Sequence, residues 1–492
     1  MKLKIKSFNW LAGRPVVILN SETAKKLNVH VDERVSLSTH SNSKIYAVVD
    51  IFENLAKDNE IGLSHEVGSL INKKLKYLEV IPAGISDVGG LIKKKLSGQS
   101  LTEKEVETIV SDIVHNNLTE SEIAYFVAAE KTRGLSSKET IYLTEAMVKN
   151  GNKIQFNKKI IADKHCVGGI AGNRTTPIVV SICAAAGLIM PKTSSRAITS
   201  ASGTADVIET ISNVEFTSQQ IKKLVEKTGA CMVWGGSLGL APSDDKIIYV
   251  ERILNLDVES QLLASIMSKK IAAGSNHIII DIPYGDGAKF SKQSAHKLAK
   301  KFSDLAKHFK LKVKTVLTLG NQPIGNGIGP ILEIMDVIKV LQNKPDAPAD
   351  LREKSIFLAS ELMTLCGIKD SKRIAREILE TGNAYEKFKE IINSQNNSDD
   401  FDKRINSLKL GKFRRIIKSS KTGKITCINN KGINSLCRIL GTPETTSAGV
   451  YLHRHLGPVK QGEPILTIYS ESPNKLGDAL IFLQKSKPIS VD

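Results

Sequence analysis

The segment 163–169, Asp-Lys-His-Cys-Val-Gly-Gly, combines residue types that can bind an anion. It follows the apolar run 160–162, which predicts a strand, and Pro177 fits the first turn of the apolar helix expected next. A glycine-rich turn between a strand and a helix directs backbone N–H groups and the helix dipole at an anion, and Lys164 adds a positive charge. The segment therefore indicates a phosphate site, with a plain connection as the alternative. It lacks the G-x-x-x-x-G-K-[ST] order of a P-loop.

A second polar segment, 194–204, holds six hydroxyl side chains together with Arg196. Hydroxyl groups donate to phosphate oxygens, and an arginine can pair with them through two N–H groups. This composition predicts binding of a second phosphate group. The alternatives are a polar surface loop, or a helix cap made by Ser202 or Thr204.

The block 249–270 carries Tyr249, Arg252 and Asp257 and then the run Ser-Ile-Met-Ser-Lys-Lys. Ser265 and Lys269 are four residues apart, so on a helix they share one face. Taken alone, the run equally describes a solvated amphipathic helix with Ile266 and Met267 turned inward.

Two further glycine-rich turns follow apolar runs, at 281–289, which ends in Lys289, and at 320–327. Either could be a plain connection. Several such turns at the carboxyl ends of strands indicate one ligand crevice at the edge of a sheet.

The elements that must position these residues follow from periodicity. β-Branched or alternating runs predict a β-rich unit over residues 1–84, with strands at 16–19, 35–37, 46–51 and 78–81 and a helix over 64–73. Amphipathic helices follow, opened by the capping-box patterns at Thr102 and Thr119 and continued over 136–149.

Strand-like runs then alternate with helices from 157 to about 415, which predicts an α/β domain whose sheet is covered on both faces. The expected strands are 159–162, 278–282 and 311–317, and the expected helices are 177–187, 291–309 and 332–341. The chain becomes β-rich again around 423–428 and 464–470.

Composition narrows the class of protein. The 492 residues are 41% hydrophobic and carry a formal net charge of +18. Such a charge fits a nucleic-acid binder, an enzyme with anionic substrates, or a lysine-rich solvated surface. Aromatic residues make up only 5%, which argues against base-stacking on single strands. No membrane span, secretion signal or C-x-x-C zinc pattern is present in the sequence, so we expect a cytoplasmic protein without a metal.

Together these segments resemble the thymidine/pyrimidine-nucleoside phosphorylase family. The resemblance rests on K-H-x-x-G-G (164–169), S-x-R…G-T (194–204), Tyr-x-x-Arg with Ser-Ile-Met-Ser-Lys-Lys (249–270), and Asn-Gln-Pro-Ile-Gly (321–325). The motifs occur in the family's order over about 86–345. The wording is closer still to an archaeal branch of this family that acts on AMP and carries an extra N-terminal domain.

The resemblance implies an α/β fold with a small helical domain and a large α/β domain of the pyrimidine-nucleoside phosphorylase type. A β-rich N-terminal domain and a β-rich C-terminal domain are added to these. The corresponding boundaries are 1–84 for the N-terminal domain, 86–155 with 243–273 for the helical domain, 156–242 with 274–413 for the α/β domain, and 414–492 for the C-terminal domain.

Two departures from the pyrimidine enzymes are informative. The loop 194–204 is rich in Ser and Thr where those enzymes have Gly and His, which is what a 5′-phosphate requires. Asp257 stands where they carry an uncharged residue, and a carboxylic acid can protonate a departing purine. The resemblance therefore implies that Asp257 is the proton donor; a cap on the helix beginning near Val258 is the alternative.

The implied reaction is phosphorolysis of a nucleoside 5′-monophosphate, AMP first, with inorganic phosphate as co-substrate and no cofactor. The family's nucleotide-binding positions correspond here to Gly169, Ser195, Arg196, Ala197, Ile198, Thr199, Ser200, Thr204, Ser265 and Lys289. Further candidates for binding phosphate or base are Lys164, His165, Ser194, Arg252 and Lys269. We expect a homodimer or larger homo-oligomer, with no nucleic-acid or membrane partner.

Three other functions stay open on sequence grounds. Arg252, Ser265 and Lys269 keep the pattern that holds a pyrimidine, so a pyrimidine-nucleoside phosphorylase is the nearest rival. A transferase of the anthranilate phosphoribosyltransferase type, which needs a metal-bound diphosphate, is another. The third is a basic nucleic-acid binder with a degenerate nucleotide site.

Overall fold

The computed structural model describes residues 1–38, 44–71, 75–84, 86–198, 200–254 and 256–492. Thr199, one of the predicted nucleotide-binding residues, and the end of the predicted helix 64–73 lie outside this part. The described chain forms two compact units. Unit 1 comprises Met1–Asn150 and Pro242–Gln261, and unit 2 comprises Gly151–Ala241 and Leu262–Asp492.

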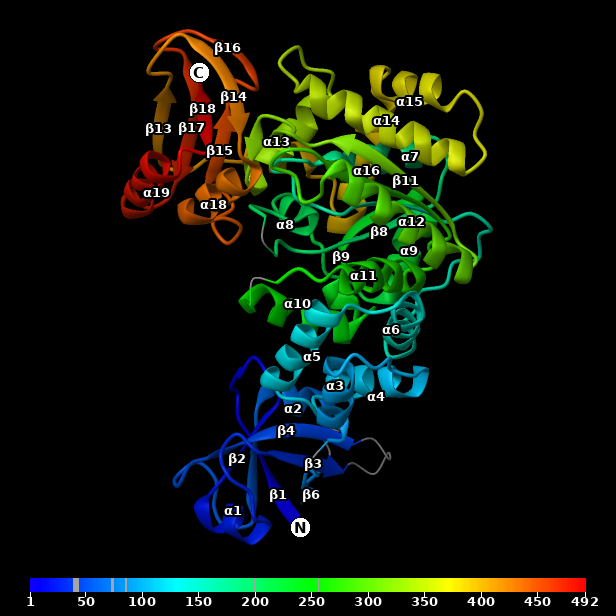
Figure 1. Cartoon of the computed structure of the whole chain (residues 1–492), viewed down its shortest axis with the longest axis vertical. Coiled ribbons are helices and arrows are strands. Elements are labelled where there is room, and N and C mark those ends of the chain that lie inside the picture. Colours follow the sequence, from blue (N-terminus) through cyan, green and yellow to red (C-terminus); the bar gives the residue numbers. More distant parts are fainter. Residues whose placement is uncertain (39–43, 72–74, 85, 199, 255) are drawn as a thin grey trace. The chain divides into compact units, whose positions relative to one another are not determined.

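Unit 1 begins with a closed six-stranded barrel in the order β1-β5-β2-β4-β3-β6 (Figure 1). Its strands are β1 Lys2–Ser7, β2 Val16–Leu19, β3 Arg34–Ser38, β4 Lys44–Ile51, β5 Glu60–Leu63 and β6 Tyr77–Pro82, with the helices α1 Ser21–Leu27 and α2 His65–Leu70. The predicted strands in this region are confirmed. Alternating apolar side chains such as Leu3, Val17 and Val35 fill the barrel interior, and closure leaves it no free edge.

Helices make up the rest of unit 1. They are α3 Val88–Leu96, α4 Glu103–Val114, α5 Glu120–Arg133, α6 Ser137–Lys149, α10 Pro242–Leu254 and the first residues of α11 Glu259–Ala272. The capping boxes predicted at Thr102 and Thr119 are present, and Ser136 makes a third. None of the helices in the described ranges is long and apolar enough to cross a membrane.

Unit 2 is built around the parallel sheet β11-β10-β7. Its strands are β7 Ala162–Cys166, β10 His277–Tyr284 and β11 Lys312–Leu319. The central strand β10 is almost entirely buried, which explains its nearly continuous apolar sequence. The parallel pair β8 Met190–Ser194 and β9 Ala230–Trp234 lies next to it, with Ala162 donating to the Ile189 carbonyl at 2.8 Å.

The strand predicted at 159–162 begins later than expected. β7 pairs with β10 from Ala162 to Cys166, so Asp163, Lys164 and His165 lie within the strand and not in the turn after it. Charged residues can occupy a buried strand only where counter-charges meet them. Those counter-charges come from distant segments that the local pattern does not reveal.

Helices pack around these strands in unit 2. They are α7 Thr175–Ala185, α8 Thr204–Glu209, α9 Ser218–Thr228, α12 Lys292–His308, α13 Pro330–Leu341, α14 Ala349–Leu365, α15 Ser371–Glu380, α16 Asn383–Asn396 and α17 Phe401–Asn406, with a 3-10 turn at Gly236–Leu238. The apolar helix α7 is buried on all sides among α14, α15 and α16. The helices predicted at 177–187, 291–309 and 332–341 are confirmed within a few residues.

The last part of unit 2 is β-rich, as the sequence indicates. It contains β13 Phe413–Lys418, β14 Gly423–Ile428, α18 Asn430–Leu440, β15 Gly449–Leu452, β16 Gly457–Val459, β17 Pro464–Ser470, α19 Pro473–Ser486 and β18 Ile489–Val491. β12 Gly327–Ile328, from the α/β part, pairs with β15 in the sheet β12-β15-β17-β13. The chain after residue 413 therefore shares a sheet with the α/β part, and the boundary predicted there stays a prediction.

Candidate functional site

Three glycine-rich turns meet at the carboxyl ends of β7, β10 and β11 in unit 2. Gly168 and Gly169 have φ values of +86° and +93°, which a residue with a side chain rarely adopts. A Cβ placed on Gly169 would lie 2.9 Å from the Cβ of Lys289, so the first two turns touch. Ile324 donates to the Ala171 carbonyl at 3.1 Å, which joins the third turn to the first. The structure therefore brings together the turns that the sequence predicted to share one crevice.

Lys164 points from β7 to the first turn of α7. Its side chain is fully buried, and its Nζ donates to Thr175 Oγ1 at 2.8 Å and to Thr176 Oγ1 at 3.3 Å. Burial lowers the pKa of Lys164 below its usual value. An ammonium group beside two hydroxyls at the N-terminus of an apolar helix suits the binding of an anion.

Asp163 faces the other side of β7 and neutralises two buried lysines. Lys270 Nζ lies 2.7 Å from Asp163 Oδ2, and Lys192 Nζ lies 3.6 Å from Oδ1. Burial opposes the ionisation of Asp163, but the two lysines outweigh it and hold its pKa below the usual value. Burial and the neighbouring Lys270 lower the pKa of Lys192 to about 7.

The lysines of this cluster also help to keep His165 uncharged. Burial, followed by Lys270 and Lys192, holds the pKa of His165 well below its usual value, so the imidazole is neutral at neutral pH.

Ser265 and Lys269 lie four residues apart on α11, as predicted. Ile266 and Met267 are buried, as the amphipathic-helix alternative expected, but the helix is not a solvated one, because Ser268 and Lys270 are buried too.

Several described residues of the hydroxyl-rich loop 194–204 are held close together. Asp206 Oδ2 accepts hydrogen bonds from the N–H groups of Ala197 and Gly203, both at 2.7 Å. A Cβ placed on Gly203 would lie 2.4 Å from the Ser195 carbonyl oxygen. The N-cap of α8 is Gly203, so neither Ser202 nor Thr204 is the capping residue.

Ser194 ends β8 with a hydroxyl that has no hydrogen-bond partner among the described residues. Its Oγ is buried and makes no hydrogen bond within the described part of the chain. A buried hydroxyl without a partner costs free energy, and a bound phosphate oxygen would satisfy it. Ser194 therefore suits the phosphate-binding role that the sequence suggested for it.

Arg196 is occupied by carboxylates in this structure. Its guanidinium pairs with Glu209 and lies 3.5 Å from Asp206 and from Glu215, above the ring of Trp234. The hydrogen bond to Glu209 and the negative charge of that residue raise the pKa of Arg196. Any phosphate that bound to Arg196 would have to share the guanidinium with these groups, and the residue's binding role stays a prediction.

Sequence reasoning missed Arg174 and Glu333, which join the two segments predicted to bind anions. Arg174 Nη1 donates to Thr204 Oγ1 at 2.8 Å, and its Nε donates to Glu333 Oε2 at 2.6 Å. One signal was available. An arginine immediately before an apolar helix opposes the helix dipole, so it calls for a partner elsewhere.

The helix α18, from the last part of unit 2, also supports these turns. Asn430 Oδ1 accepts from the Ala171 N–H at 3.1 Å, while its Nδ2 donates to the Gly320 carbonyl at 3.1 Å. Arg438 donates to the Ile198 carbonyl at 3.0 Å. No local signal in the sequence pointed to these contacts, because they join residues more than 100 positions apart.

In unit 1, Asp257 lies between α10 and α11. Lys131 Nζ donates to the Asp257 carbonyl at 2.8 Å, and the Val258 N–H donates to Glu251 Oε1 at 3.3 Å. Arg252 lies on α10 with its guanidinium 5.6 Å from the ring centre of Tyr249. The turn that carries the predicted acid is thus held by side chains from α5 and α10.

Glu130, on α5, is a second acid near this turn. It is fully buried and accepts a hydrogen bond from Ser260 Oγ at 3.1 Å. Burial raises the pKa of Glu130 to about 8, so the carboxyl is protonated at neutral pH.

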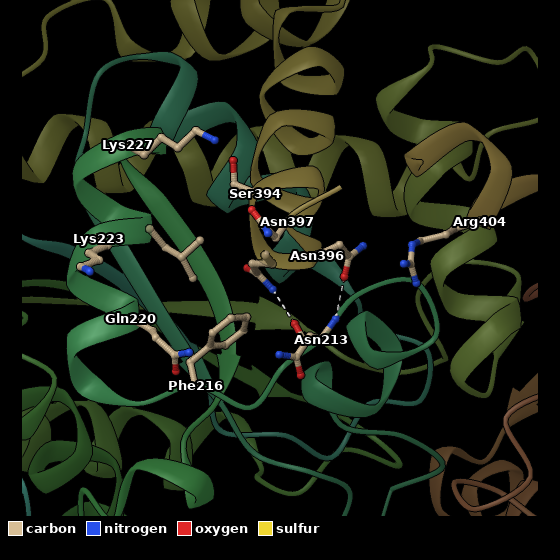
Figure 2. A pocket seen from close by; sticks show the side chains of 11 residues that line it. Asn213, Phe216, Gln220, Lys223, Lys227, Ser394, Asn396, Asn397 and Arg404 are labelled. Carbon is tan, nitrogen blue, oxygen red and sulfur yellow. Dashed lines mark hydrogen bonds between the residues drawn. The ribbon is translucent and has the colours of Figure 1, made fainter. Parts of the chain in front are cut away.

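A pocket of about 680 Å³ lies elsewhere in unit 2, between α9 and the end of α16. Figure 2 shows the side chains that line it. Its amide side chains are engaged with the protein itself: Gln395 Nε2 donates to the Asn213 carbonyl at 2.9 Å, and Asn396 Oδ1 accepts from the Asn213 N–H at 2.9 Å. None of the predicted site residues lines this pocket.

The six cysteines, all within the described ranges, form no disulfide. Burial, followed by the charge of Asp281, raises the pKa of the Cys166 thiol to about 11, so it remains protonated. Among the described residues, no group of three His, Cys, Asp or Glu side chains could hold a metal ion.

Comparisons with family models and with individual proteins show what this chain is similar to. Residues 90–151 match the helical-bundle domain of the glycosyl transferase family, and residues 158–385 match its α/β domain. The chain is 42% identical to the AMP phosphorylase of Pyrococcus furiosus over all of this chain and 98% of the relative. It is 40% identical to the AMP phosphorylase of Thermococcus kodakarensis and 39% identical to that of Methanococcoides burtonii, with 98% and 97% of those chains covered.

Among solved structures, anthranilate phosphoribosyltransferase from Thermus thermophilus superimposes with a TM-score of 0.51 at 17% identity. The similarity covers 63% of this chain and 99% of that one. At this level of identity the likeness concerns the fold alone.

Proposed function

The chain belongs to the AMP phosphorylase family, and from this premise we infer that it cleaves the N-glycosidic bond of AMP with inorganic phosphate. The products are adenine and ribose 1,5-bisphosphate. This conclusion rests on the similarity to several AMP phosphorylases, which are 39–42% identical over the full length of this chain. The two alternative enzymes are not favoured, because the relatives named here are AMP phosphorylases and the transferase likeness is one of fold.

We propose that inorganic phosphate binds near Lys164 and the turn Gly168-Gly169. Thr175, Thr176 and the unpartnered hydroxyl of Ser194 would supply donors. One phosphate oxygen attacks C1′ of the ribose while the bond from C1′ to the purine nitrogen breaks. Positive charge on the sugar develops through an oxocarbenium-like state, which the adjacent phosphate anion stabilises.

The nucleotide is proposed to bind through Gly169, Ser195, Arg196, Ala197, Ile198, Thr199, Ser200, Thr204, Ser265 and Lys289. The close approach of Gly169 to Lys289 supports a shared role for these two. His165, Arg252 and Lys269 remain candidates for contacts to the base or phosphate. Asp257 is the proposed general acid, which transfers its proton to the ring nitrogen of the departing adenine.

Domain organisation and assembly are proposals as well. The barrel of residues 2–82 and the β-rich segment after 413 support an N-terminal and a C-terminal domain added to the helical and α/β domains. We propose a cytoplasmic homodimer or larger homo-oligomer that requires no cofactor.

The test uses the purified full-length protein with AMP, with and without inorganic phosphate. Adenine release is expected only when phosphate is present, and ³¹P NMR should show the two phosphorus signals of ribose 1,5-bisphosphate. Activity should survive EDTA, unlike that of a transferase that needs metal-bound diphosphate. Release of adenine without phosphate, or absence of the bisphosphate, would reject the proposal.

A further inference from the structure

Arg174 occupies an unusual position for a cation. It is the N-cap residue of α7, where the helix dipole disfavours a positive charge, and only 11% of its side chain is exposed. A buried ion pair costs desolvation and by itself adds little stability. Its position is therefore explained better by what the guanidinium contacts than by the needs of the helix.

The guanidinium contacts two segments that the sequence separates widely. Its Nη1 donates to Thr204 Oγ1 at 2.8 Å, and its Nη2 donates to the Ser202 carbonyl at 2.9 Å. The next residue along the chain, Thr175, accepts from Lys164. Arg174 thus joins the hydroxyl-rich loop 194–204 to the end of α7 where inorganic phosphate is proposed to bind.

Glu333 holds Arg174 in this orientation. It lies on α13 with its side chain 1% exposed and accepts from Arg174 Nε at 2.6 Å. Its other oxygen accepts from the Gly329 N–H at 3.0 Å and from the Ser202 hydroxyl. Because the carboxylate is fixed from three directions, the guanidinium has little freedom to turn.

The direction of these hydrogen bonds determines what the hydroxyls can still do. An arginine N–H can only donate, so Thr204 Oγ1 is the acceptor and its own proton is available to another group. Ser202, in contrast, gives its proton to Glu333. Within this part of the loop Thr204 is therefore prepared as a donor to an anion, while Ser202 serves the structure.

We propose that Arg174, oriented by Glu333, is a positioning residue that directs the Thr204 hydroxyl to the 5′-phosphate of the nucleotide. It does so while fixing the loop 194–204 against the N-terminus of α7. The inference rests on the proposed function, since it requires a substrate that carries a 5′-phosphate.

The experiment compares kcat/KM for AMP and for adenosine in the wild type, Arg174→Lys, Thr204→Val and the double variant. Loss of a charge-assisted hydrogen bond lowers binding by roughly 10- to 100-fold. Arg174→Lys and Thr204→Val should each reduce kcat/KM for AMP by about this factor while changing that for adenosine much less. The loss of kcat/KM for AMP in the double variant should be smaller than the product of the two single losses, because both changes weaken the same contact.

Arg404→Lys serves as the matched control, since Arg404 pairs with Asp400 at 2.7 Å in the same unit. It should leave both substrates unaffected. Glu333→Gln, which preserves the side-chain shape, provides the same comparison if Arg174→Lys does not fold.

Equal losses for AMP and adenosine, or additive losses in the double variant, would show that Arg174 only supports the fold and would overturn the inference. If the wild type itself turned over both substrates equally, the proposed function would fall together with it. A wild type that prefers AMP, combined with an unchanged preference in Arg174→Lys, would overturn this inference alone.

Discussion

Replacing Asp163 by asparagine would remove the only carboxylate that faces both Lys192 and Lys270 among the described contacts of these lysines. Asp163 is fully buried and also accepts from Ser275 Oγ at 3.1 Å and from the Lys164 N–H at 2.7 Å. Asparagine keeps the shape but not the charge. Below the pKa of Lys192, two ammonium groups would then remain in the interior without this counter-ion.

Breaking a buried ion pair by removing one partner costs about 3–5 kcal/mol. At roughly 2 °C per kcal/mol for a unit of this size, the midpoint of thermal unfolding should fall by about 6–10 °C at neutral pH. The deficit should be larger near pH 6 than near pH 8, because Lys192, whose pKa is lowered to about 7 even beside Asp163, loses its proton at the higher pH and no longer adds an uncompensated charge.

Differential scanning calorimetry of wild type and Asp163→Asn at both pH values measures this effect. Asp304→Asn is the control, since Asp304 is 54% exposed and lies 3.7 Å from Lys307. Its midpoint should shift by no more than about 1 °C, because exposed pairs contribute little. An Asp163→Asn shift as small as that of the control would refute the reasoning about buried charge.

Three further predictions concern single side chains. Ser194→Ala should leave thermal stability nearly unchanged, since no protein partner is lost, but should raise the KM for phosphate by roughly tenfold; an unchanged KM would contradict the phosphate role. Asp257→Asn should lower kcat for AMP by about 10²- to 10⁴-fold while the Kd for AMP changes little; undisturbed turnover would exclude Asp257 as the acid. Folding raises the pKa of Glu130 from 4.5 to about 8, so the folded state keeps a proton that the unfolded state loses, and stability should fall as pH rises between these values. The free energy of unfolding should fall by on the order of 5 kcal/mol at most. Thermal unfolding midpoints measured between these pH values should therefore decrease in the wild type, and Glu130→Gln should lack this decrease.

Local patterns were sufficient for most elements and for the turns of the site. The capping boxes at Thr102 and Thr119 and the strands β14 and β17 were predictable because their signals lie within a few residues. The adjacency of the three glycine-rich turns was predictable because carboxyl ends of parallel strands meet at one sheet edge.

What the sequence could not predict depends on contacts between distant residues. β7 begins later than its apolar run suggested, because Lys192 and Lys270 supply the charges that allow Asp163 inside the sheet. The structural roles of Arg174, Glu333 and Asn430 could likewise not be predicted, because each role depends on hydrogen-bond partners elsewhere in the chain. In each case the residue type was visible but its partner was not.

The account depends on a phosphate on the nucleotide being bound beside a free phosphate. Steady-state kcat/KM for AMP and for adenosine, measured with the same enzyme at saturating phosphate, tests this directly. A site with donors built for the 5′-phosphate should favour AMP by at least about a hundredfold. Equal values for the two substrates would contradict it.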